Sequence, residues 1–181
     1  LEWINLMNPE LDNLRMSIQW GIENNPEAAV RLVINAYDFF VYKGNVREGF
    51  ETSMKILNVI PVTDNKLKIQ LLNNISQLCY IMGEFVQLEK FTGEALELSR
   101  GINYKEGIIK CLNTLSLKEY AELKYDYAAK LNEEALSLSI ELNSDKYKAE
   151  SLYNLSFPVD ARGEYDRSIS LKEDALKLTR E

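Results

Sequence analysis

The sequence predicts an all-α protein built as a solenoid of antiparallel helix pairs, and three observations lead to that prediction. The chain repeats itself at an interval of about 40 residues, apolar residues within each copy recur every three or four positions, and glycines or capping residues separate these stretches. A spacing of three and four forms one stripe along a helix, whereas a strand would alternate at every second residue. Self-similarity at roughly 20 to 50 residues is typical of stacked helical or strand units.

The repeat covers most of the chain. A shift of 40 residues superposes like residues on one another: Leu72 on Leu112 and Leu152, Ser76 on Ser116 and Ser156, and Ala95 on Ala135 and Ala175. An earlier copy precedes these at an interval of 39, with Gly44 in the place of Gly83 and Gly163. We therefore expect an N-terminal linker helix at 1–25, followed by an array at 26–181 with repeats at 26–63, 64–103, 104–143 and 144–181.

Capping chemistry marks the expected starts of helices. Asn8 and Asn25 each precede a proline at the first helical position, and Asp64 and Ser144 have side chains that can cap two further helices. With the apolar periodicity, these signals predict nine helices, at 9–23, 26–43, 46–58, 64–82, 85–100, 104–122, 125–142, 145–161 and 165–180.

The turns inside the repeats are expected to be left-handed. Gly83 and Gly163 follow the first helix of their pairs, where glycine adopts a positive φ without strain. The third copy has Leu123 at this place, so its turn should be less relaxed. Pro158 falls inside a predicted helix and predicts a kink or an early stop near Phe157. Whether this bend acts as a hinge or is merely irregular stays open, and we favour the latter.

Composition excludes several function classes. The formal net charge is -7, which opposes direct binding of nucleic acid, and the chain contains no histidine. Cys79 and Cys111 lie in apolar helical patterns and are expected to be buried, reduced thiols, so we predict no metal site and no cofactor. The sequence has no run of about 18 apolar residues, so we predict no membrane span and expect a cytoplasmic protein. The first residue is Leu1, so we interpret the chain as a piece of a longer protein.

The last copy resembles the tetratricopeptide repeat. The resemblance is carried by Leu155-Ser156, Gly163-Glu164-Tyr165-Asp166, Ser168 and Ala175-Leu176, and it covers about residues 26–181. The position of close helix approach holds Gly49, Leu88, Ala128 and Ser168, so the family's small residue is missing at Leu88. The resemblance implies a right-handed superhelix that binds proteins or peptides, and the interval of about 40 implies longer helices or connections than usual.

A second resemblance concerns the beginning of the chain. The segments 10–20, 36–40 and 44–49 are similar to the entry into the helical sensor array of signal-transduction ATPases with numerous domains, which include maltose-activator-like transcription regulators. In those proteins the array is implied to restrain the ATPase or to bind an inducer. The chain itself has no phosphate-binding glycine-rich loop, so an ATPase would lie upstream.

The tetratricopeptide resemblance also implies a site. The first helix of each pair lines the concave groove of the family, and its groove-facing positions correspond to ten polar or aromatic residues here: Asn35, Asp38, Asn73, Asn74, Gln77, Tyr80, Asn113, Tyr120, Tyr153 and Asn154. Asparagine offers a donor and an acceptor, so a column of asparagines can pair with an extended peptide backbone. The alternative is that these asparagines face solvent or bond to a neighbouring helix, and that the tyrosines belong to the core.

Catalysis is not expected. The commonest general base is missing, most acids lie on predicted exposed faces, and an inward pair such as Asp38 with Glu48 would need burial to raise one pKa. We therefore predict a non-catalytic module that binds a protein or peptide and regulates a larger bacterial signalling protein. A stand-alone peptide receptor or adaptor and a structural self-assembly repeat stay open. Other domains of the same chain, or a second copy that forms a homodimer through exposed end helices, are also candidate partners.

Overall fold

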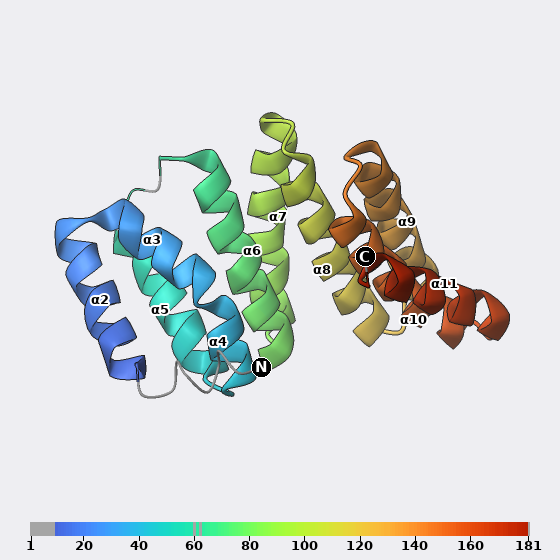
Figure 1. Cartoon of the computed structure of the whole chain (residues 1–181), viewed down its shortest axis with the longest axis horizontal. Coiled ribbons are helices and arrows are strands. Elements are labelled where there is room, and N and C mark those ends of the chain that lie inside the picture. Colours follow the sequence, from blue (N-terminus) through green and yellow to red (C-terminus); the bar gives the residue numbers. More distant parts are fainter. Residues whose placement is uncertain (1–9, 60, 62, 181) are drawn as a thin grey trace. The chain divides into compact units, whose positions relative to one another are not determined.

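The structure is a computed structural model that describes residues 10–59, 61 and 63–180. These residues form ten α-helices and no strand, which confirms the predicted all-α class (Figure 1). The chain divides into two compact units, Leu1–Phe91 and Thr92–Glu181. None of the helices in the described residues is long and apolar enough to cross a membrane.

The first unit contains five complete helices and the start of a sixth. They are α2 (Leu11–Asn24), α3 (Pro26–Asn35), α4 (Tyr37–Tyr42), α5 (Val46–Val59) and α6 (Asn65–Met82), followed by α7 (Phe85–Gly101), which crosses the boundary between the units. Helix α3 packs against its chain neighbours α2 and α4 and also against α5 and α6, so it lies at the centre of the contacts in this unit. The buried side chains of Val30, Val33 and Phe39 come from the apolar stripe of this segment.

Three of the predicted helix caps are present. The side chain of Asn25 accepts a hydrogen bond from the backbone N–H of Ala28 at 3.2 Å. Asp64 Oδ1 accepts from the N–H groups of Lys66 and Leu67 at 2.8 and 3.2 Å. Ser144 Oγ lies 3.5 Å from the N–H of Tyr147, a longer and weaker contact. The predicted cap at Asn8 and Pro9 lies outside the described residues.

The expected single helix at 26–43 is wrong, because the structure divides it into α3 and α4 at Ala36. Ala36 has a ψ of -3°, which takes it out of the regular helix. The next turn places two adjacent rings in the core, since Phe39 and Phe40 are both buried and meet edge to face at 6.1 Å. Phe40 also lies so close to Gly49 of α5 that a Cβ at Gly49 would be 2.8 Å from the Cβ of Phe40. We attribute the break to this packing.

The second unit contains four complete helices. They are α8 (Lys105–Ala121), α9 (Tyr125–Glu141), α10 (Asp145–Ala161) and α11 (Tyr165–Leu178). Helices α8 with α9, and α10 with α11, are the pairs predicted from the repeat, and α10 packs on both α8 and α9 (Figure 1). The core between them contains Ile109, Leu112, Leu131 and Ala135.

The predicted left-handed turns are present, including the one in which Leu123 replaces glycine. Gly83 and Gly163 have φ values of 75° and 81°, and Leu123 stands in the same turn with φ 63°. All three turns share one pattern of backbone bonds, shown by Lys124 N donating to Glu119 O at 2.9 Å and Glu84 N donating to Cys79 O at 2.9 Å. A leucine in this conformation is strained where glycine is not.

The early stop expected near Phe157 is wrong, because α10 continues to Ala161 with Pro158 inside it. Pro158 and Val159 are buried, and Val159 packs with Leu155 against Ala129 of α9. Proline has no N–H, so the carbonyl of Asn154 loses its helical donor. Packing on α9 holds the helix together across this lost bond.

Candidate partner-binding surface

The ten predicted site residues divide into exposed, half-buried and buried ones. Asn35, Asp38 and Tyr153 are exposed, and Gln77, Tyr80, Tyr120 and Asn154 are half-buried. Asn73, Asn74 and Asn113 are buried, with exposed fractions of 1%, 9% and 2%. The exposed and half-buried residues can meet a partner directly, and the three buried asparagines cannot without a rearrangement of helices.

The buried asparagines join neighbouring first helices. Asn74 of α6 donates from Nδ2 to the carbonyl of Ile34 in α3 at 3.0 Å. Asn113 of α8 donates to Glu150 Oε1 at 3.3 Å and accepts from Ser151 Oγ at 3.4 Å, both in α10. The alternative that asparagines bond to a neighbouring helix therefore holds for Asn74 and Asn113. A buried amide needs such partners, because leaving it without them costs free energy.

The aromatic residues of the second unit form a continuous surface on its first helices. The ring centroids of Tyr120 and Phe157 are 6.1 Å apart, and those of Phe157 and Tyr153 are 4.9 Å apart in an edge-to-face arrangement. Tyr125 lies 5.5 Å from Tyr120 at the turn. We call Tyr120, Tyr153 and Phe157, with the adjacent Asn154, the aromatic surface. In the first unit Tyr80 pairs with Phe85 at 6.4 Å in the manner of Tyr120 with Tyr125.

Beside the aromatic surface, an open groove runs between α10 and α11. It encloses about 730 Å³ and is lined by Ala149, Tyr153, Lys172, Ala175, Leu176 and Leu178, among others. Ala149 and Ala175 form its floor, while Leu176 and Tyr153 are 48% and 52% exposed. Lys172 Nζ lies 5.9 Å from the ring of Phe157 and 3.8 Å from Asp160 Oδ1, so this cation belongs to the groove and to the aromatic surface.

Sequence reasoning missed the groove. Its residues lie on both helices of the last pair, whereas only first helices were considered as carriers of a site. A change of charge between repeats could have indicated it. Lys146 stands one repeat after Glu106, and Lys172 stands one repeat after Asn132.

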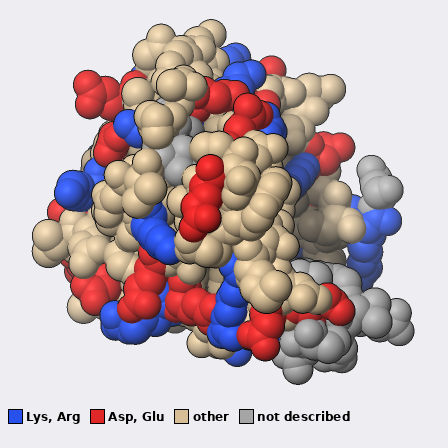
Figure 2. Space-filling view, turned by 90° about the vertical axis from the view of Figure 1, so that its left-hand side faces the viewer, with Lys and Arg blue, Asp and Glu red and all other residues tan. Residues whose placement is uncertain are grey.

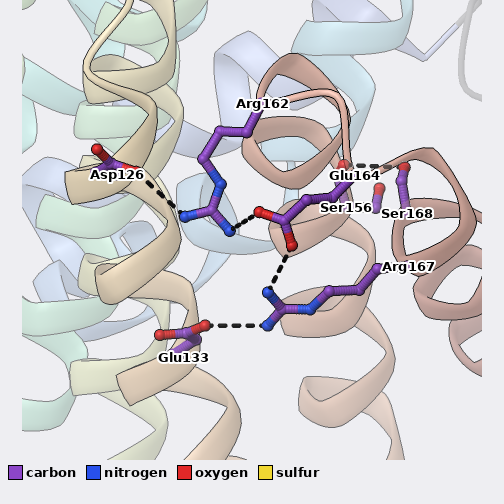
Figure 3. A network of polar contacts seen from close by, with 7 residues as sticks. All are labelled: Asp126, Glu133, Ser156, Arg162, Glu164, Arg167 and Ser168. Carbon is purple, nitrogen blue, oxygen red and sulfur yellow. Dashed lines mark hydrogen bonds and ion pairs between the residues drawn. The ribbon is translucent and has the colours of Figure 1, made fainter.

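Charged side chains elsewhere form ties between helices. Arg162 bridges Asp126 of α9 and Glu164 at 3.2 and 2.7 Å, and Arg167 of α11 bridges Glu164 and Glu133 of α9 at 3.1 and 3.2 Å (Figure 3). Nearby, Ser168 Oγ donates to the carbonyl of Ser156 at 3.0 Å (Figure 3). Isolated exposed ion pairs contribute little, but this network fixes the turn between α10 and α11 against α9.

No continuous basic area is visible on the face seen from the side of α2, where acidic and basic residues are interspersed (Figure 2). Together with the net charge of -7, this surface gives no support for phosphate binding.

The pKa values of Glu48 and Cys79 are shifted by their surroundings. Glu48 is paired with Arg15 at 2.6 Å, and this hydrogen bond lowers the pKa of the carboxyl group, opposite to the rise needed for a general acid. Cys79 is buried, and burial raises the pKa of its thiol to about 11. A thiol of that pKa is protonated near neutral pH and is a poor nucleophile.

Comparison with known proteins identifies the fold. No family model and no curated protein matches the sequence. Among solved structures, BtubC (BKLC) from P. vanneervenii has a TM-score of 0.72 and 16% identity, over 98% of this chain and 77% of that protein. A putative kinesin light chain from Podosopora anserina with nearly identical TPR-like repeats has a TM-score of 0.67 and 11% identity, over 97% and 92%.

A third match is YrrB, described as a TPR protein with an unusual peptide-binding site. It has a TM-score of 0.56 and 14% identity, over 100% of this chain and 85% of that protein. This chain has a tetratricopeptide-type fold. Identities of this size show the fold alone, and the tetratricopeptide array expected from the sequence is thereby confirmed at the level of architecture.

Proposed function

We propose that the chain is a non-catalytic tetratricopeptide-type module that binds a protein or peptide segment on the exposed face of its first helices. The observation that carries this proposal is the aromatic surface, where Tyr120, Phe157 and Tyr153 lie in an unbroken row with ring centroids 6.1 and 4.9 Å apart. Tyrosine combines a large apolar ring with a polar tip and is enriched at interfaces for that reason. The half-buried Asn154 beside the row adds a donor and an acceptor.

In the first unit, the same function would use Asn35, Asp38, Gln77 and Tyr80, which are exposed or half-buried. Asn73, Asn74 and Asn113 would act as positioning residues within the helix packing. YrrB, a TPR protein with an unusual peptide-binding site, supports a peptide as one class of ligand for this architecture.

The biological setting that we propose is regulatory. The similarity of residues 10–49 to the entry of sensor arrays in signal-transduction ATPases supports a module that controls a larger bacterial signalling protein in the cytoplasm. Sequencing the gene on the 5′ side of the codon for Leu1 tests this setting. A nucleotide-binding domain there would support it, and an unrelated open reading frame would contradict it in favour of a stand-alone receptor or adaptor.

The binding proposal is tested by substitution on the aromatic surface. Tyr120→Ala combined with Asn154→Ala removes a ring and an amide that are both half-buried, so helicity should be kept. The control is Tyr127→Ala on α9, because Tyr127 is 54% exposed but lies on a second helix. We expect a partner captured quantitatively from the native cell extract to be lost with the double variant and retained with the control. Equal capture by all three proteins would contradict the proposal.

A further inference from the structure

The turn between α8 and α9 contains charged residues at positions that are uncharged in the neighbouring repeats. Lys118 and Glu119 are only 4% and 7% exposed. The residues at the same places one repeat away are buried and carry no charge: Leu78, Cys79, Pro158 and Val159. Removing a charged group from water costs free energy, and even a buried ion pair is often no more stable than well-packed apolar side chains of similar volume.

Four ion pairs join these two residues to the turn that follows. Lys118 Nζ lies 3.2 Å from Glu119 Oε1 and 3.0 Å from Glu122 Oε2. Lys124 Nζ lies 3.2 Å from Glu119 Oε2 and 2.6 Å from Glu122 Oε2. The hydrogen bond from Lys124 lowers the pKa of Glu122, and the hydrogen bond from Lys118 lowers it further, so this carboxyl group is ionised near neutral pH. We call Lys118, Glu119, Glu122 and Lys124 the charge ring.

The two exposed members of the charge ring oppose the dipoles of the helices beside them. Glu122 caps the C-terminal end of α8, where partial negative charge gathers, and Lys124 caps the N-terminal end of α9, where partial positive charge gathers. At the next turn the signs are exchanged, because Arg162 caps the end of α10 and Glu164 caps the start of α11. Each turn has a close ion pair, at 2.6 and 2.7 Å, but only the pair of Arg162 and Glu164 complements its helix ends (Figure 3).

The buried pair explains this reversed order. With the signs of the next turn, Lys118 would meet a cation and Glu119 would meet an acid, so the buried charges require the order that the helix dipoles disfavour. Between the two exposed members stands Leu123, whose φ of 63° is strained for leucine. Buried charge, opposed helix dipoles and backbone strain therefore coincide in residues 118–124.

The same segment carries one end of the aromatic surface. Tyr120 lies within it, and the ring of Tyr120 meets that of Phe157 in α10 at 6.1 Å. Close to Phe157 in α10, Val159 is fully buried and packs in a cluster with Ala129 of α9. The α10 end of the aromatic surface is thus anchored by apolar packing, while the α8 end stands among charges.

We propose that residues 118–124 form a hinge, which opens locally in the native protein and lets Tyr120 move relative to Phe157. This inference deepens the proposed function, on which its biological role rests, by adding a movable part to the aromatic surface. A partner that contacts both rings would select the closed form of the hinge.

Opening is easier at this turn than at the next one. The four ion pairs join residues no more than six positions apart, so they can persist while water reaches Lys118 and Glu119. At the α10–α11 turn, opening would expose Val159 and break the ion pair of Arg162 with Asp126 of α9. Segments with little buried apolar surface open locally at a lower free energy than those anchored in the core.

Hydrogen exchange of the free chain tests the hinge. Lys118→Leu with Glu119→Val, the apolar variant, introduces residue types of the neighbouring repeats and leaves Glu122 paired with Lys124. Protection of the backbone amides in 118–125 should rise by at least about ten-fold, because opening would then expose apolar side chains. Amides in 159–164 are the internal control and should change by less than about two-fold. Unchanged or lower protection of 118–125, or a loss of helicity in circular dichroism, would overturn the proposal.

Exchange of the exposed pair is a second test. Glu122→Arg with Lys124→Glu, the exchanged variant, copies the charge order of the next turn. In the wild-type background it should lower protection of 118–125 by about ten-fold, because Lys118 and Glu119 lose their partners. Combined with the apolar variant it should raise protection by about three-fold, since the new charges complement the helix ends. Effects of the same sign in both backgrounds would contradict the role of the charge ring.

Motion at the aromatic surface is measured separately. NMR relaxation dispersion should show microsecond-to-millisecond exchange at the amide of Tyr120, much weaker exchange at Tyr153, and loss of the Tyr120 exchange in the apolar variant. Equal exchange at both tyrosines would mean that the whole surface moves and would overturn the hinge.

These measurements use the free chain, so their failure leaves the proposed function standing. Equal capture of the cellular partner by the wild type and by Tyr120→Ala with Asn154→Ala would contradict the proposed function, whereas the exchange rates would still support the hinge.

Discussion

Two grooves of the second unit are copies of one structure: helix α10 covers the groove between α8 and α9, and the groove between α10 and α11 is open. Asn113 and Tyr153 occupy the same repeat position, but Asn113 is 2% exposed and bonded to α10, while Tyr153 is 52% exposed. The last helix pair also has Ala149 and Lys172 where the preceding pair has Ile109 and Asn132. The comparison shows that the repeat position determines the direction in which a side chain points. Whether the side chain is buried or exposed depends on whether a following helix packs over it.

The largest expected effect is a difference in the free energy of unfolding between substitutions in the two grooves. Ile109→Ala should lower the free energy of unfolding by about 2–5 kcal/mol, because Ile109 is fully buried beneath α10 and its loss leaves a cavity. Leu176→Ala removes a side chain that is 48% exposed, so it should lower the free energy of unfolding by less than about 1 kcal/mol. Urea unfolding followed by circular dichroism measures both. Similar losses for the two variants would mean that something covers Leu176 in solution.

A smaller effect is expected at the paired positions 113 and 153. Asn113→Ala leaves Ser151 and Glu150 without their partner and should cost about 1–3 kcal/mol. Tyr153→Ala should lower the free energy of unfolding by less, about 0.5–1 kcal/mol, since the side chain is 52% exposed and loses mainly its edge-to-face contact with Phe157. Hydrogen exchange in α10 gives a local reading, and faster exchange there in the Asn113 variant alone is the expected result. Equal protection of α10 in both variants would contradict the role assigned to Asn113.

The smallest effect concerns the turns that follow the first helices of the two pairs. Leu123 and Gly163 have φ values of 63° and 81°, so leucine is strained where glycine is relaxed. Leu123→Gly should raise the free energy of unfolding by roughly 0.5 kcal/mol, because relief of strain exceeds the added entropy of the unfolded chain. Gly163→Ala should lower it by about 1 kcal/mol. Thermal unfolding tests the pair, and shifts of the same sign would contradict the explanation from backbone strain.

Much of this architecture could be predicted from the sequence, because its signals are local. Asp64 caps a helix through atoms two and three residues away, and Gly83 ends one through its own φ. The break at Ala36 depends on how Phe40 meets Gly49 in another helix, and the continuation of α10 past Pro158 depends on Val159 packing against α9. Such tertiary contacts are not visible in periodicity.

The site was harder to predict for a geometric reason. Successive residues are about 100° apart around a helix, so an error of one position moves a side chain from the exposed face to the contact with the next helix. Gln77 is half-buried, but Asn74 is turned toward Ile34 and Asn73 is buried. The repeat interval could not reveal which columns face outward, because a buried column recurs at the same interval as an exposed one.

The bond from Asn74 to Ile34 joins residues 40 positions apart, which is one repeat. Closing a loop of this length has a modest entropy cost that rises only slowly with length, by about 0.6 kcal/mol per doubling. Helix contacts within each unit join elements that are close in the sequence, such as α8, α9 and α10, so the coupling between distant parts of the chain is weak and unfolding need not be a single two-state transition. Folding can then begin in either unit and spread from one helix to the next.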